Sequence, residues 1–111
     1  MQLRIDWENP YLTEEQTAAV APGDLDDFYA AACPTDQLNL FFVLLNTCTR
    51  AQERGESAEE ARLCFLMAYY LFVPLTPPGS WPLAQHYISR AVALDPCPQY
   101  RELQDLIFAG N

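Results

Sequence analysis

Lysine is absent from the chain of 111 residues, and histidine occurs only once. The six basic residues are all arginine and are set against fifteen acidic residues, so the formal net charge is −9. Proteins that bind nucleic acid phosphates or anionic membrane surfaces need clustered lysine and arginine. The composition therefore argues against direct nucleic acid binding and against membrane binding, and it is compatible with a basic protein partner.

Long apolar segments are also lacking. The longest apolar run, residues 63–75, has 13 residues, whereas a transmembrane helix needs about 20. The first ten residues, MQLRIDWENP, contain no basic segment followed by an apolar one, so we expect no secretory signal peptide and a cytoplasmic protein. The length favours a single folded unit, which we divide into an extended N-terminal arm over residues 1–12 and a helical domain over residues 13–111.

The usual catalytic and metal-binding motifs are missing. The four cysteines form no Cys-x-x-Cys pair, and the four glycines are too widely separated for a phosphate-binding loop. We expect the cysteines to be reduced, buried apolar residues. The single histidine, His86, falls on the polar side of its expected helix, and a zinc site would require distant residues to converge. We therefore expect no enzymatic activity, no cofactor and no metal.

Helix start and stop signals occur throughout the rest of the chain. Thr13-x-x-Gln16 and Ser57-x-x-Glu60 have the pattern of a capping box, and Asp24 is a candidate N-cap after the Pro22-Gly23 break. Residues 74–82 are rich in proline and predict a loop. The predicted helices cover residues 13–21, 25–33, 35 or 36 to about 54, 57–73, 82–94 and 98–109. The predicted fold class is all-α, a compact bundle of five or six helices.

Residues 2–7, QLRIDW, alternate between polar and apolar side chains. Leu3, Ile5 and Trp7 would share one face of an extended segment. This segment could pair as a strand with another chain or lie as an arm on the helices. We favour the arm, because no second convincing strand follows and isolated strands are marginally stable.

Two of the predicted helices are unusually apolar. In the helix ending near residue 54, Leu38, Phe41, Phe42 and Leu45 follow the i, i+3, i+4, i+7 pattern, and Leu40, Val43 and Leu44 are apolar as well. Residues 63–73 are apolar on all sides. Either these two helices pack against each other at the centre, or part of one is a partner surface. We favour central packing, because large exposed apolar patches are rare.

Residues 84–96, AQHYISRAVALDP, place Ala84, Ile88 and Ala91 on one face and end at Pro96. This spacing resembles the second helix of a tetratricopeptide repeat, in which small residues allow two helices to approach closely. The last predicted helix then resembles the capping helix of such an array. The expected first helix of the repeat lacks the signature residues, and no tandem copy precedes it. The resemblance implies a TPR-like helical hairpin and a role in protein interaction.

These features predict non-enzymatic protein binding by a small adaptor, chaperone-like or regulatory subunit. The candidate partner contacts are aromatic residues in the arm, the apolar helix and the Pro-rich loop: Trp7, Tyr11, Tyr69, Tyr70, Phe72 and Trp81. Some could pack on the chain itself instead, with Trp81 folded over its helix and Trp7 and Tyr11 pinning the arm. The usual burial of tryptophan favours that alternative.

Acidic residues suggest a second function. Residues 1–36 contain eight acidic residues and one arginine, so most of the negative charge lies in the first third of the chain. An acidic inhibitor, such as an anti-CRISPR protein, mimics nucleic acid in this way and blocks a basic groove. The candidate phosphate mimics are Glu14, Glu15, Asp24, Asp26 and Asp27. The same acids also suit helix starts, and the GDLDD segment lacks the further ligands of a calcium loop. A homodimer with facing apolar helices is a third possibility.

Overall fold

The computed structural model describes residues 2–110, and within this range it confirms an all-α fold of six helices without a strand. A π-helical turn, η1, directly extends the fourth helix. The elements are α1 (Glu14–Ala19), α2 (Pro22–Ala31), α3 (Pro34–Glu53), α4 (Ser57–Tyr70), η1 (Leu71–Leu75), α5 (Ser80–Leu94) and α6 (Pro98–Ala109).

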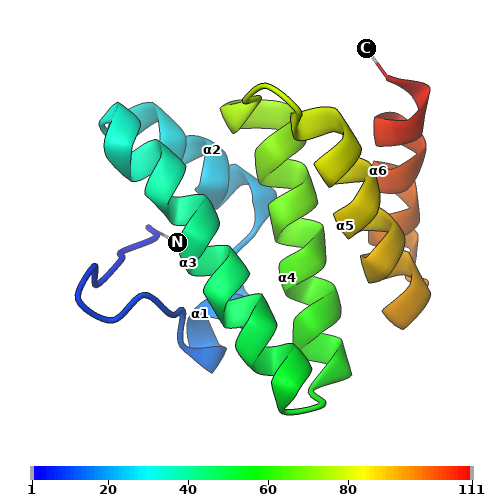
Figure 1. Cartoon of the computed structure of the whole chain (residues 1–111), viewed down its shortest axis with the longest axis horizontal. Coiled ribbons are helices and arrows are strands. Elements are labelled where there is room, and N and C mark those ends of the chain that lie inside the picture. The colour runs from blue at the N-terminus through cyan, green and yellow to red at the C-terminus, as the bar shows by residue number, and fades with distance from the viewer. Residues whose placement is uncertain (1, 111) are drawn as a thin grey trace.

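Helix α4 lies at the centre of the molecule (Figure 1). Helix α3 packs along one side of it and α5 along the other, while α6 packs on α5 and both α1 and α2 contact α4. Every residue of the stretch 63–68 is buried, as are Tyr70 and Leu71. The apolar segment is therefore the core of the bundle, which confirms that the two apolar helices pack against each other. No helix within residues 2–110 is long and apolar enough to span a membrane.

The buried face of α3 differs from the one with the clearest helical spacing. The side chains that face the core are those of Leu40, Val43, Leu44, Thr47, Cys48 and Ala51. Leu38 and Phe42, which belong to the predicted apolar stripe, are about half exposed. Because α3 is apolar around most of its circumference, periodicity alone could not select the face that α4 covers.

The predicted N-termini of two helices, α2 and α4, are wrong in detail. Pro22 was expected to end a helix, but it is the first residue of α2, where its missing N–H costs nothing. Asp24 is therefore not the N-cap. Its carboxylate accepts a hydrogen bond of 2.8 Å from the backbone N–H of Ala21 and holds the start of α2 from inside the first turn.

The Ser57-x-x-Glu60 capping box is not formed either. Helix α4 begins one residue earlier than this motif implies, with Glu56 at the N-cap position, and Glu60 is buried. The Glu60 carboxylate accepts a hydrogen bond from Nε of Arg90 on α5 at 3.1 Å. Glu60 thus joins two helices rather than capping one. The Thr13-x-x-Gln16 capping box, by contrast, is confirmed at α1.

Pro74 does not end the helical path where the sequence predicted. A proline inside an α-helix clashes with the carbonyl four residues earlier. Here the backbone widens into the π turn η1, with Pro74 inside it, and the N–H of Thr76 bonds to the carbonyl of Leu71. The turn ends at Thr76, whose φ of 41° lies in the left-handed region. The loop to α5 is consequently shorter than the predicted residues 74–82.

Helix α5 buries the small-residue face that the sequence predicted. Ala84, Ile88 and Ala91 are fully buried, and α4 and α5 form the most extensive helix contact of the fold. At the other end of this layer, Tyr100 of α6 stacks on Phe65 of α4 with ring centroids 4.8 Å apart. The helices α4, α5 and α6 therefore form a continuous packed layer, while the relationship to a tetratricopeptide repeat stays a prediction.

Candidate functional site: a groove between the N-terminal arm and α2

The N-terminal arm is extended, and the bundle holds it at both ends. Leu3 and Leu12 are buried, and the N–H of Leu12 donates to Oγ1 of Thr47 on α3 at 3.0 Å. Arg50, also on α3, donates to the carbonyl of Leu12 at 3.0 Å. The arm therefore packs on the helices of its own chain, as expected. The backbone turns at residues 7–9 between the two ends.

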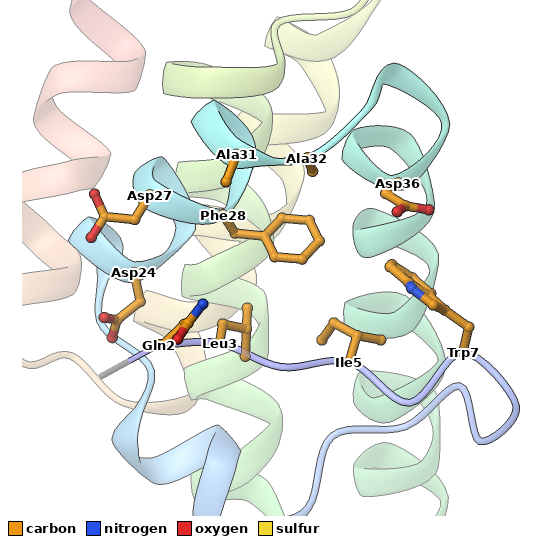
Figure 2. Close-up of a pocket in the computed structure, with 10 residues that line it drawn as sticks. All are labelled: Gln2, Leu3, Ile5, Trp7, Asp24, Asp27, Phe28, Ala31, Ala32 and Asp36. Carbon is orange, nitrogen blue, oxygen red and sulfur yellow. The ribbon is translucent and has the colours of Figure 1, made fainter.

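A groove of about 740 Å³ lies between this arm, helix α2 and the start of α3. Its apolar lining comes from Leu3, Ile5 and Trp7 of the arm together with Phe28, Ala31 and Ala32. Figure 2 shows Leu3, Ile5 and Trp7 on the same side of the arm, with the ring of Phe28 reaching toward them from α2. The alternation in QLRIDW thus predicts correctly which residues share a face. The volume of the groove lies within the usual range for ligand sites.

Carboxylates border the groove at both of its ends. In Figure 2, Asp24 and Asp27 of α2 lie on the side of the groove where Gln2 lies, whereas Asp36 of α3 lies above the ring of Trp7 on the opposite side. Asp24 is engaged with the backbone of Ala21, and this hydrogen bond lowers the pKa of its carboxyl group. Within residues 2–110, Asp27 and Asp36 make no side-chain hydrogen bond or ion pair, which leaves their charges available to a ligand.

Trp7 is the aromatic residue of this site that is accessible to a ligand. Its side chain is 43% exposed, and its ring lies 6.4 Å from that of Phe28. A second hollow on its other side, lined by Pro10 and Phe42 among others, continues from Trp7 along α3. Trp7 therefore packs near Phe28 and at the same time presents an exposed aromatic surface to a ligand. Tyr11 is also exposed, and the Arg50 guanidinium lies over its ring at 4.4 Å from the ring centroid.

The aromatic residues predicted on α4 do not form one surface. Tyr70 is completely buried and its hydroxyl donates to the carbonyl of Gln37, so it cannot contact a partner. Tyr69 is partly buried and donates to Asp26 of α2 at 2.7 Å. Burial and this hydrogen bond raise the pKa of Tyr69 to about 12. Phe72 lies apart, in a hollow beside Trp81.

Trp81 lies in the first turn of α5 rather than in a loop. Its indole Nε1 donates to the carbonyl of Ile107 at 2.7 Å, which ties the start of α5 to the end of α6. Its side chain nevertheless stays 47% exposed, next to the end of η1. The structure therefore separates Trp81 and Phe72 from the groove that contains Trp7.

The acidic residues proposed as phosphate mimics lie on two helices with different surroundings. Glu14 and Glu15 occupy the first turn of α1, where the helix dipole favours negative charge. Asp24 and Asp26 are engaged in hydrogen bonds of the fold. Asp27 alone among the residues predicted on α2 is exposed and makes no such bond. The five acids consequently do not form a row of equivalent, unengaged charges.

Three carboxylates meet elsewhere, between α1 and the start of α4. Oxygen atoms of Glu14, Glu56 and Glu59 lie within 4.8 Å of one another. Burial and the neighbouring carboxylates raise the pKa of Glu59. The charge of Arg50 acts in the opposite direction on Glu59, and Arg62 lines the same hollow. The dipole at the start of α4 accounts for two of these acids without any ion.

Sequence reasoning identified part of the groove and missed the rest. It singled out Trp7, Asp24 and Asp27, but not Phe28, Ala31 or Asp36. No local sequence pattern marks these residues as part of a site. The arm and α2 lie side by side only because the chain reverses direction at α1. No family model matches this chain, and neither the curated proteins nor the solved structures contain a match to it.

Proposed function

We propose that this protein is a small non-enzymatic protein-interaction module, and that the groove between the arm and α2 binds a basic amphipathic segment of its partner. The segment would place apolar side chains on the floor formed by Ile5, Trp7 and Phe28. Arginine or lysine residues at its two ends would meet Asp27 and Asp36. An adaptor or regulatory subunit would act through such a contact.

The observation that carries this proposal is the combination of an apolar floor with unengaged carboxylates at both ends of one groove. Apolar contact supplies most of the binding free energy, while the charges select and orient the segment. The formal charge of −9 would attract basic partners over a longer range. The resemblance of residues 84–96 to a tetratricopeptide repeat helix would fit an interaction module, but these residues do not line the groove.

The direct test uses a short synthetic peptide that has valine and leucine residues between terminal arginines. Binding is followed by the fluorescence of Trp7 in a Trp81→Phe background, which removes the second indole. We expect saturable quenching, and no binding of the same peptide with glutamates in place of the arginines. Equal responses to both peptides would contradict the proposal.

Matched charge variants locate the contact. Asp27→Asn with Asp36→Asn should weaken binding by about fivefold, since each partly exposed ion pair contributes modestly. Glu15→Gln with Glu102→Gln changes the net charge by the same amount at exposed positions outside the groove. This control should leave the affinity nearly unchanged. An equal loss in both double variants would mean that only the overall charge matters.

Ionic strength separates this function from nucleic acid mimicry. A mimic depends on many exposed charges, so its affinity for a basic protein should fall steeply with added salt. Docking in the groove should lose only the small contribution of two carboxylates. An affinity that falls steeply with salt and is unchanged by Trp7→Ala would favour the acidic inhibitor. A dimeric mass of the isolated protein would favour self-association.

A further inference from the structure

Two cysteines that are sixteen residues apart in sequence meet at the α3–α4 contact. The Sγ atoms of Cys48 and Cys64 lie 3.8 Å apart, and their residues are 7% and 2% exposed. Their burial was expected, whereas no sequence pattern predicts that they form a pair. The other two cysteines differ from expectation, because Cys33 is exposed and Cys97 is partly exposed.

Both thiols line a surface cavity of about 430 Å³. The polar groups that share this cavity come from three helices: Thr49 and Gln52 of α3, Glu60 of α4, and His86, Tyr87 and Arg90 of α5. His86 is exposed, as the sequence predicted. It nevertheless lines the same cavity as the two cysteines, which no sequence pattern predicts. A small polar reagent that enters from solvent therefore reaches the sulfur atoms in a charged environment.

The two thiols are not equivalent. Either sulfur can be the donor of their hydrogen bond; this contact lowers the pKa of Cys48 and, together with burial, raises that of Cys64. The nearby charges act in opposite directions on Cys48, because Arg90 stabilises its thiolate and Glu60 disfavours it. Cys48, the more exposed residue, is accordingly the better nucleophile.

We propose that Cys48 and Cys64 are a peroxide-reactive dithiol that closes to a disulfide between α3 and α4. This site is independent of the groove at the N-terminal arm. The sulfur atoms already touch, and side-chain adjustment of roughly 1.7 Å would bring them from 3.8 Å to a bonded distance.

The oxidant is hydrogen peroxide or a small organic hydroperoxide. The Cys48 thiolate attacks one peroxide oxygen, the O–O bond breaks, and the leaving hydroxide or alkoxide takes up a proton to become water or an alcohol. Cys48 is then a sulfenic acid. The Cys64 sulfur displaces its hydroxyl group, which leaves as water with the Cys64 proton. Overall, two thiols lose two electrons to the peroxide and form one S–S bond.

The primary experiment uses a Cys33→Ser, Cys97→Ser background, so that Cys48 and Cys64 are the remaining thiols. Both replaced cysteines occupy N-cap positions, where serine is well tolerated. After limited peroxide treatment we expect complete loss of free thiol, a mass decrease of two hydrogens and a cross-linked Cys48–Cys64 peptide. The melting temperature should rise by roughly 10 °C and return to its starting value with dithiothreitol.

Single variants assign the roles. With Cys64→Ser, the sulfenic acid at Cys48 should accumulate and be trapped by dimedone. With Cys48→Ser, the remaining Cys64 should react at least about tenfold more slowly. Equal reactivity of the two single variants would overturn the assignment of Cys48 as the attacking thiol.

Two charge variants retain hydrogen-bonding groups while changing the field at the pair. Arg90→Gln should slow oxidation by roughly threefold and Glu60→Gln should accelerate it by a similar factor, because Arg90 lowers the pKa of Cys48 and Glu60 raises it. The proposal is overturned if the thiols persist under conditions that oxidise free glutathione, or if peroxide yields sulfinic acid without a disulfide. Rate changes of the same sign in both charge variants would also contradict it.

Discussion

Helices α3 to α6 and the preceding residues 2–33 are stabilised differently. In the former, buried side chains follow one another along α4 and continue into α3, α5 and α6. In the latter, the buried apolar side chains are widely spaced: Leu3, Leu12, Val20 and Leu25. Polar contacts reinforce two of these positions, since Thr47 and Arg50 bind the backbone of Leu12 and Arg62 binds the carbonyl of Val20.

This difference relates stability to function. Residues 2–33 are held by a few apolar contacts and several side chain-to-backbone hydrogen bonds. Such a region can keep an open groove, because other elements do not cover all of its apolar surface. The candidate binding groove lies in this region, whereas the oxidisable cysteine pair lies where α3 packs on α4. The two proposed sites therefore belong to parts of the fold that should respond differently to mutation.

The largest effect is expected in α4. Leu66 is fully buried, so Leu66→Ala should lower the free energy of unfolding by about 3–4 kcal/mol through lost apolar contact and a residual cavity. Urea unfolding followed by circular dichroism measures this change. Leu106→Ala, at a leucine that is 57% exposed, should change it by less than about 0.5 kcal/mol. Similar losses in both variants would argue against α4 as the centre of the core.

A smaller effect is expected where the arm meets α3. Thr47→Val removes the acceptor of the Leu12 N–H and should cost about 1–2 kcal/mol, because a buried donor loses its partner. Limited proteolysis should then cleave the arm faster while α3 to α6 stay protected. Thr49→Val is the matched control, since the exposed Thr49 hydroxyl bonds only to a carbonyl of its own helix. If the arm is no more accessible in Thr47→Val, this contact does not hold it.

The exposed residue that follows η1 provides a stabilising variant. Thr76 has a φ of 41°, which disfavours a β-branched residue and is better tolerated by asparagine. Thr76→Asn should therefore raise the free energy of unfolding by about 0.5–1 kcal/mol, as measured by urea unfolding. Thr35→Asn, in the first turn of α3, should give no comparable gain. Destabilisation by Thr76→Asn would show that the threonine side chain contributes more than its backbone strain costs.

The smallest effect concerns the carboxylates between α1 and α4. The pKa of Glu59 is raised in the folded state by burial and by Glu56 and Glu14, so its charged form opposes folding. Its contribution is favourable at low pH and is lost as the pH rises through the folded-state pKa. Glu59→Gln should therefore stabilise the protein by about 0.2–0.5 kcal/mol at neutral pH.

The pH dependence supplies the check on this variant. The gain from Glu59→Gln over the wild-type protein should shrink as the pH is lowered and Glu59 takes up a proton, which urea unfolding at several pH values will show. Glu102→Gln on α6 serves as the control, because it lies outside this cluster. A gain that persists unchanged in acid would exclude charge repulsion as its cause.

Several features were predictable because they depend on local chemistry. Thr13 and Gln16 form their capping box, and the small residues of α5 lie on its buried face. The alternation of the arm also placed Leu3, Ile5 and Trp7 on one side. Each of these features is specified within a few residues, so the sequence itself contains the information.

Other features depended on which distant residues meet. The buried face of α3 was selected by α4, because an almost entirely apolar helix has no preferred side of its own. Glu60, which the sequence pattern predicted as part of a capping box, instead forms an ion pair with Arg90 on α5. The π turn around Pro74 likewise let the chain continue beyond the point where a regular α-helix would end.

The sequence by itself thus determined the all-α class, the approximate helices and the acidic, lysine-free character of the surface. The tertiary structure alone decided that Phe28 and Asp36 complete a groove with Trp7, and that Cys48 meets Cys64. The physical reason is the range of the interactions: helix formation and charge are local properties, whereas a groove or a pair of thiols exists only after packing brings separate helices together.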